Sequence, residues 1–113
     1  MAKGKDKVVE DLKRYHDKIK DLYNIKKIIL FGSYAKGTEK AESDIDVGVV
    51  IDEKEHSKWL DIGINLAKEA IDIDVKIETK CIFWDDYCNC EETSILAEIK
   101  KTGIEIYSSQ EGV

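Results

Sequence analysis

A glycine and a serine directly after an apolar run are the first residues that could do chemistry. Residues 28–31 are continuously apolar and predict a buried strand, and Gly32 and Ser33 follow at once. A glycine there lets the backbone approach a ligand closely, and the N–H groups opening the next helical segment attract an anion. The Ser33 hydroxyl adds a donor and Lys36 a positive charge. A Gly-Ser pair alone is more often only a turn, so this segment becomes a predicted phosphate-binding turn only in context.

An Asp-x-Asp pair supplies that context. Apolar residues alternate over 45–51 as in a strand with one buried face, and Asp44 directly precedes this segment while Asp46 lies near its start. Side chains two apart on a strand share a face, so both carboxylates can reach the same hard cation. Mg²⁺ is usually held by one or two carboxylates together with substrate phosphates. An isolated pair of this kind is more often a solvated strand start.

A third carboxylate is expected from the next strand along the chain. Apolar residues in period two over 71–77 predict that strand, with Asp72 and Asp74 on the opposite face. Next to the Asp44–Asp46 strand, one of them would complete a cluster able to hold two metal ions and take a proton from a hydroxyl. Asp74 is favoured because it lies deeper in the predicted strand, but the choice between Asp72 and Asp74 stays open.

The remaining elements follow from hydrophobic spacing. Apolar residues three and four apart predict helices over 8–22 and 59–70 and a last helix through 95–99, which a strand over 104–107 follows. Residues 79–92 fit no period and are predicted to be a loop or a short irregular strand. The order of elements predicts a mixed β-sheet with helices packed against it, an α/β or α+β fold.

Composition limits what such a domain can be. The 113 residues are expected to form one domain over 1–113, and the net charge of −6 argues against duplex DNA as a partner. Long apolar runs and a signal-type N-terminus are missing, so a cytoplasmic protein without membrane contact is expected. An odd number of cysteines fits a reducing compartment, and the spacing of Cys81, Cys88 and Cys90 does not fit a zinc site.

The combined pattern resembles a known family. A buried strand, Gly32-Ser33, ten further residues, Asp44-x-Asp46 and a later Asp74 are similar to the minimal nucleotidyltransferases of the DNA polymerase beta superfamily. The resemblance implies that Gly32 and Ser33 bind a nucleoside triphosphate, with ATP the expected donor, and that Asp44 and Asp46 ligate Mg²⁺. It implies that Asp74 completes the metal site and activates the acceptor. The reaction would be attack on the α-phosphate with release of pyrophosphate.

The resemblance also implies a partner. Small members of this family resemble the antitoxin half of two-gene modules, whose other half is an all-helical HEPN-type toxin, and some adenylylate a tyrosine on it. The chain departs from the family pattern where it has Tyr34 and Lys36 in place of the frequent arginines. A lysine cannot form the bidentate hydrogen bonds of an arginine, and this difference would weaken binding of the triphosphate.

Other readings of the same residues remain open. The length leaves no second domain for an acceptor, so another chain, a bound macromolecule or a homo-oligomer would have to complete the acceptor site. One alternative is a catalytically idle antitoxin that acts by binding alone. The other is nucleotidyl transfer to a small molecule, which is disfavoured because such family members usually carry an added helical domain.

Overall fold

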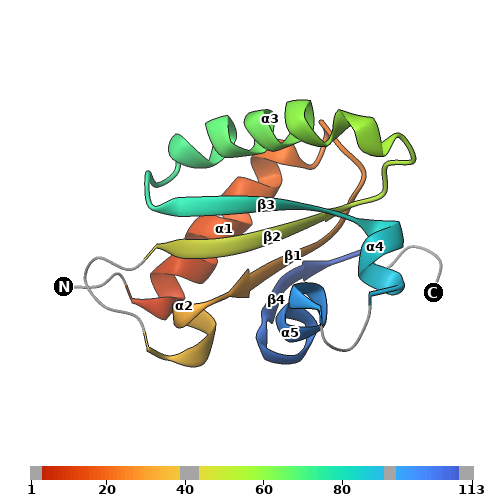
Figure 1. Cartoon of the computed structure of the whole chain (residues 1–113). Helices are drawn as coiled ribbons and strands as arrows, with labels where there is room; N and C mark the ends of the chain where they lie inside the picture. Colours follow the sequence, from red (N-terminus) through yellow and green to blue (C-terminus); the bar gives the residue numbers. More distant parts are fainter. Residues whose placement is uncertain (1–3, 39–43, 91–93, 110–113) are drawn as a thin grey trace.

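The core of the structure is a four-stranded mixed sheet. The computed structural model describes residues 4–38, 44–90 and 94–109. The strands are β1 (Ile25–Phe31), β2 (Ile45–Ile51), β3 (Ile77–Phe83) and β4 (Ile104–Ser108), and they lie in the order β3-β2-β1-β4 (Figure 1). β1 is antiparallel to both of its neighbours, whereas β2 and β3 are parallel. The predicted mixed sheet with packed helices is confirmed.

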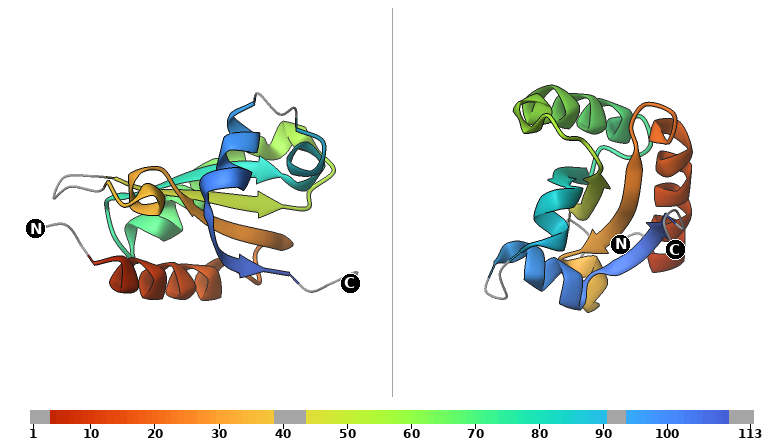
Figure 2. Two further views of the ribbon diagram at one scale, coloured as in Figure 1. Left: turned by 90° about the horizontal axis from the view of Figure 1, so that it is seen from below. Right: turned by 90° about the vertical axis from the view of Figure 1, so that its right-hand side faces the viewer.

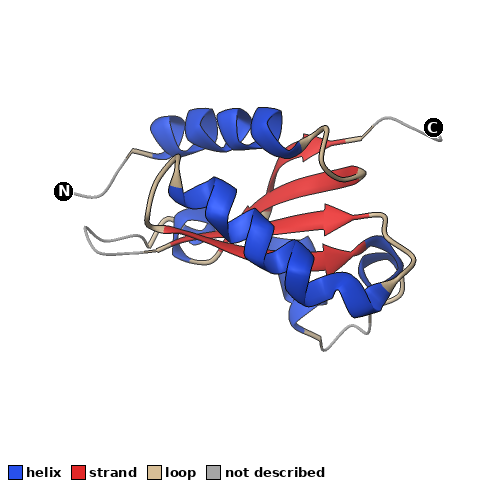
Figure 3. Ribbon diagram, turned by 90° about the horizontal axis from the view of Figure 1, so that it is seen from above, coloured by secondary structure: helices blue, strands red, loops and turns tan. Residues whose placement is uncertain are grey.

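Two long helices cover one face of the sheet. They are α1 (Lys5–Ile19) and α3 (Trp59–Ile71), with a short 3₁₀ turn, η1 (His56–Lys58), before α3; both lie across the same face in Figure 3. Tyr15 of α1 donates a hydrogen bond of 2.8 Å from its hydroxyl to the carbonyl of Leu66 in α3. The larger core lies beneath these helices, as their apolar stripes predict.

Shorter helices cover part of the opposite face. α4 (Trp84–Cys88) and α5 (Ile95–Thr102) lie there, away from α1 and α3 (Figure 2). They close a second, smaller core that contains Ile29, Val50 and Ile82. The loop or irregular strand expected over 79–92 is therefore wrong for its described part, because β3 continues to Phe83 and α4 follows directly. Among the described residues, every helix is too short or too polar to span a lipid bilayer.

The strand expected over 71–77 is also wrong. α3 continues to Ile71, residues 72–76 form a turn, and β3 begins at Ile77. The backbone N–H groups of Ile73 and Asp74 both bond to the carbonyl of Ala70, at 2.9 and 3.0 Å, and these bonds hold the turn. The alternating apolar residues thus come from a helix end and a turn, which a short periodic run cannot distinguish from a strand.

Candidate active site

The Gly32 turn lies directly against the Asp-x-Asp pair. β1 ends at Phe31, and the short helix α2 (Ser33–Lys36) follows Gly32 and ends at Gly37. Gly32 has a backbone φ of +75°, which residues other than glycine rarely adopt. A Cβ atom at this position would collide with Oδ2 of Asp46. Both backbone conformation and space therefore require glycine, and the predicted phosphate turn and carboxylate pair are brought together.

Asp46 is the centre of the acidic cluster. It lies on β2 between Phe31 of β1 and Glu78 of β3, which are its partners in the sheet register. Burial raises the pKa of Asp46, and the negative charges of Glu78 and Asp44 and a hydrogen bond with Glu78 raise it further. Carboxylates held this close repel one another when charged, and a divalent cation relieves such repulsion.

Glu78 takes the place that the sequence interpretation gave to Asp74. Asp74 lies in the turn before β3, where its Oδ1 accepts a hydrogen bond of 2.9 Å from the backbone N–H of Lys76. The carboxylate of Asp72 is 3.1 Å from the ammonium of Lys18 on α1. Neither aspartate lies on β3, so the strand argument for both is wrong. The missed signal was the helical spacing that continues to Ile71 and moves the strand, and its acidic position, towards the C-terminus.

The fit of this cluster to Mg²⁺ rests on its donors. Asp44, Asp46 and Glu78 supply only carboxylate oxygens, the ligands that a hard cation prefers. Within residues 4–38, 44–90 and 94–109, no three acidic, histidine or cysteine side chains stand as a preformed metal site. The arrangement is compatible with an ion that takes its remaining ligands from substrate phosphates and water, as Mg²⁺ usually does.

Tyr34 and Lys36 have different surroundings. Tyr34 is buried in the larger core, so its side chain is a packing element of α2. Lys36 is half-exposed, and its ammonium is 3.8 Å from the carboxylate of Glu98 on α5. An exposed pair at this distance is weak and leaves Lys36 available to a ligand. The role of Lys36 in phosphate binding therefore stays a prediction.

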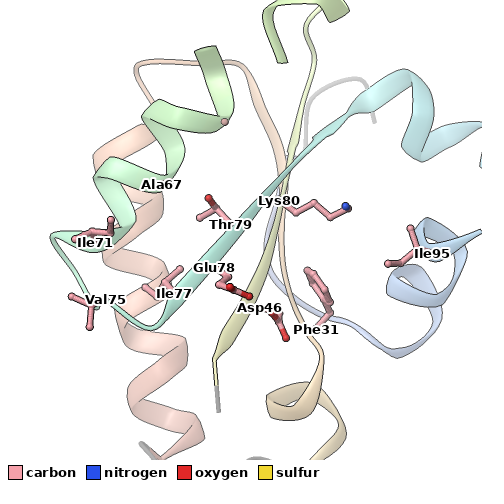
Figure 4. Close-up of a pocket in the computed structure, with 11 residues that line it drawn as sticks. Phe31, Asp46, Ala67, Ile71, Val75, Ile77, Glu78, Thr79, Lys80 and Ile95 are labelled. Atoms are coloured by element: carbon pink, nitrogen blue, oxygen red, sulfur yellow. The ribbon is translucent and has the colours of Figure 1, made fainter. Parts of the chain in front are cut away.

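A cavity connects the acidic cluster to the open edge of the sheet. It has a volume of about 560 Å³, within the range of small-molecule sites. Asp46, Glu78, Lys80 and Phe31 lie on the side of α5, whereas Ile71 and Val75 line it on the side of α3 (Figure 4). Lys80, two residues after Glu78 on the same face of β3, was not singled out from the sequence. The acidic end of this cavity, at Asp46 and Glu78, is the part that belongs to the candidate site.

Comparisons with known proteins agree with this geometry. Residues 10–112 match the family described as polymerase beta, nucleotidyltransferase. A protein of Methanocaldococcus jannaschii, named provisionally as a protein adenylyltransferase, is 40% identical over 76 residues, which are 64% of this chain and 75% of that protein. A second protein from the same organism, with the same provisional name, is 29% identical over 105 residues, 88% of this chain and 98% of its own.

Solved structures share the fold. A chain from Sulfolobus solfataricus, described provisionally as a nucleotidyltransferase, superposes with a TM-score of 0.70 at 15% identity, covering 99% of this chain and 96% of its own. A chain from a crystal structure of a toxin-antitoxin with AMP-PNP superposes with a TM-score of 0.54 at 20% identity, covering 90% and 74%. At these identities the likeness is one of fold.

Proposed function

Because the chain belongs to the polymerase beta nucleotidyltransferase family, we propose that it transfers AMP from ATP, with Mg²⁺, to a hydroxyl group of a partner protein. The observation that carries this proposal is that Gly32 leaves no room for a Cβ beside the Asp46 carboxylate, because this close approach supports a phosphate-binding turn next to the acidic cluster. Relatives named provisionally as protein adenylyltransferases support ATP as the donor and a protein as the acceptor.

The proposed reaction assigns a role to each part of the site. Asp44, Asp46 and Glu78 would hold Mg²⁺, which when bound neutralises charge on the reacting phosphate. The backbone at Gly32 and the Ser33 hydroxyl would bind the triphosphate, and Lys36 would add positive charge. The acceptor oxygen bonds to the α-phosphorus, the bond to the leaving pyrophosphate breaks, and the acceptor proton passes to a carboxylate. Glu78 is assigned this last role because it lies beside Asp46 on the neighbouring strand β3.

We place the acceptor on a toxin partner. Among the described residues, all elements belong to the sheet and the helices packed on it, so no separate acceptor module is present in them. The fold shared with a chain of a toxin-antitoxin crystal structure supports an antitoxin setting. A tyrosine of a HEPN-type toxin remains the proposed acceptor, on the resemblance set out above.

Labelling with α-³²P ATP tests the proposal. The protein is incubated with Mg²⁺ and labelled ATP, with and without a HEPN-type protein encoded by an adjacent gene. Label on that partner, lost in Asp44→Asn with Asp46→Asn and kept in the matched surface variant Asp61→Asn, is expected. A tight complex that acquires no label would instead identify an antitoxin that acts by binding alone, and label on a small molecule would remove the protein acceptor.

A further inference from the structure

β3 leaves one side of its backbone without a strand partner. It is at the edge of the sheet, and the N–H of Ile45 bonds to the carbonyl of Lys76 at 2.9 Å. Lys76 therefore directs its backbone carbonyl towards β2. Successive residues of a strand direct their backbone N–H and C=O groups to opposite sides, so those of Ile77, Thr79 and Cys81 point away from β2. No other described strand pairs with them. An unpaired edge of this kind is a template for another strand.

An exposed apolar surface of α3 adjoins this edge. Trp59, Leu60, Ile64 and Ile71 are each more than half exposed, although large apolar side chains usually lie inside. A groove of about 420 Å³ runs between α3 and β3, and it is lined by Trp59, Leu60, Gly63, Ile64, Ala67, Thr79, Lys80 and Cys81. Contiguous exposed apolar surface beside an open strand is typical of a protein interface.

We propose that this surface binds a second copy of the chain, with the two β3 strands antiparallel and a two-fold axis at Thr79. In that register Thr79 faces its own copy in a hydrogen-bonded pair, and Glu78 of each chain lies opposite Lys80 of the other. Lys80 has no ion pair with any residue that the structure describes. An axis at Cys81 also satisfies the outward backbone groups, but it places Lys80 opposite the apolar Ile82.

The same axis matches the shape of α3. β2 and β3 are parallel with α3 connecting them, so α3 runs back along β3 and the two α3 helices would also be antiparallel. Gly63 and Ala67 line the groove together with Thr79, which places them beside the axis. Gly63 of one chain would then face Ala67 of the second copy. Small residues in the middle let the helices approach closely, while Trp59 and Leu60 at one end meet Ile71 at the other.

The second copy would also contribute to the candidate active site. Glu78 then lies between Asp46 of its own chain and Lys80 of the second copy. A lysine in this position offsets the mutual repulsion of the carboxylates. Each candidate site would then contain one positively charged group, Lys80, from the other chain.

Sedimentation velocity over a range of concentrations tests the interface without nucleotide, so the result does not depend on the proposed function. We expect a dimer for the unmodified chain. A Cβ at Gly63 has no heavy atom within 4 Å, so Gly63→Gln is compatible with the folded chain but obstructs the close helix approach. Its dimer dissociation constant is expected to rise at least about tenfold. Lys68→Gln, at an exposed position of α3 that does not line the groove, is the matched control.

Charge variants test the position of the axis. Lys80→Glu places two acids opposite each other and is expected to weaken the dimer, whereas Lys80→Glu combined with Glu78→Lys restores the pairing and the affinity. A chain that stays monomeric at every concentration overturns the proposal, as does a dimer that neither Gly63→Gln nor Lys80→Glu weakens. A monomer whose Gly63→Gln variant loses a toxin partner would assign this surface to that partner instead.

Discussion

The two faces of the sheet differ in what their side chains do, although the same strands supply both. Along β2, Val47, Val49 and Ile51 point into the larger core under α1 and α3. The alternate residues Asp46 and Val50 point to the other face, where Val50 is covered with α4 and α5 but Asp46 opens into the cavity. The first face gains stability from apolar burial, whereas the second gives up part of that gain to keep charged groups together.

The largest effect is expected on the charged face. Glu78→Gln should lower AMP transfer by about 10²–10⁴-fold, the range for loss of a positioned proton acceptor, with little change in unfolding free energy. Asp74→Asn is the matched comparison, because it removes the aspartate that the sequence favoured. The rate of label transfer under saturating Mg²⁺ and ATP distinguishes them. A large loss in Asp74→Asn with an active Glu78→Gln would return the third carboxylate to the turn.

The opposite result is expected on the apolar face. Leu66 of α3 is fully buried in the larger core, so Leu66→Ala should lower the unfolding free energy by about 2–5 kcal/mol. Urea unfolding at a single protein concentration measures this change. Leu22→Ala, at a position that is 56% exposed, should change the free energy by no more than about 0.5 kcal/mol. Equal losses in the two variants would show that the larger core does not dominate stability.

Ligand binding to the face that carries Asp46 should raise the unfolding free energy. Mg²⁺ and ATP at about one hundred times their dissociation constant should add about 2.7 kcal/mol to the unfolding free energy. Thermal melting with and without both ligands measures the shift, and Asp44→Asn with Asp46→Asn should abolish it. An idle binding-only fold would melt at the same temperature in all conditions, and an unchanged shift in the double variant would refute the site assignment.

Replacement of Gly32 should affect both the unfolding free energy and ATP binding. Gly32→Ala places a side chain at φ +75° and against the Asp46 carboxylate. The expected cost is about 1–3 kcal/mol of unfolding free energy, together with loss of ATP binding. Gly37 has the same φ but no heavy atom within 4 Å of a Cβ, so Gly37→Ala is the control with strain alone. If both variants bind ATP equally weakly, strain and not the contact with Asp46 explains the loss.

These residues also show how far the sequence alone could go. The closeness of Gly32 to Asp46 could be predicted because Gly32 directly follows β1, Asp46 lies near the start of β2, and these two strands pair. Glu78 could not, because its place depends on the register between β2 and β3. A shift in where β3 begins moves every side chain of that strand, and nothing local fixes the start. The apolar face, set by residues of strong periodicity, was predictable apart from the strand boundaries.

The smallest effect concerns the repulsion that the charged face tolerates. Asp46 is partly buried beside Glu78 and near Asp44, and these surroundings raise its pKa. Asp46→Asn removes one of the repelling charges, so the metal-free protein should become more stable, by no more than about 1 kcal/mol. Urea unfolding in EDTA measures the gain in unfolding free energy, and Asp61→Asn, at an exposed position of α3, should show none. A loss of stability in Asp46→Asn would mean that the carboxylate helps to hold the Gly32 turn in place, so that the charged face would then contribute to folding as well as to chemistry.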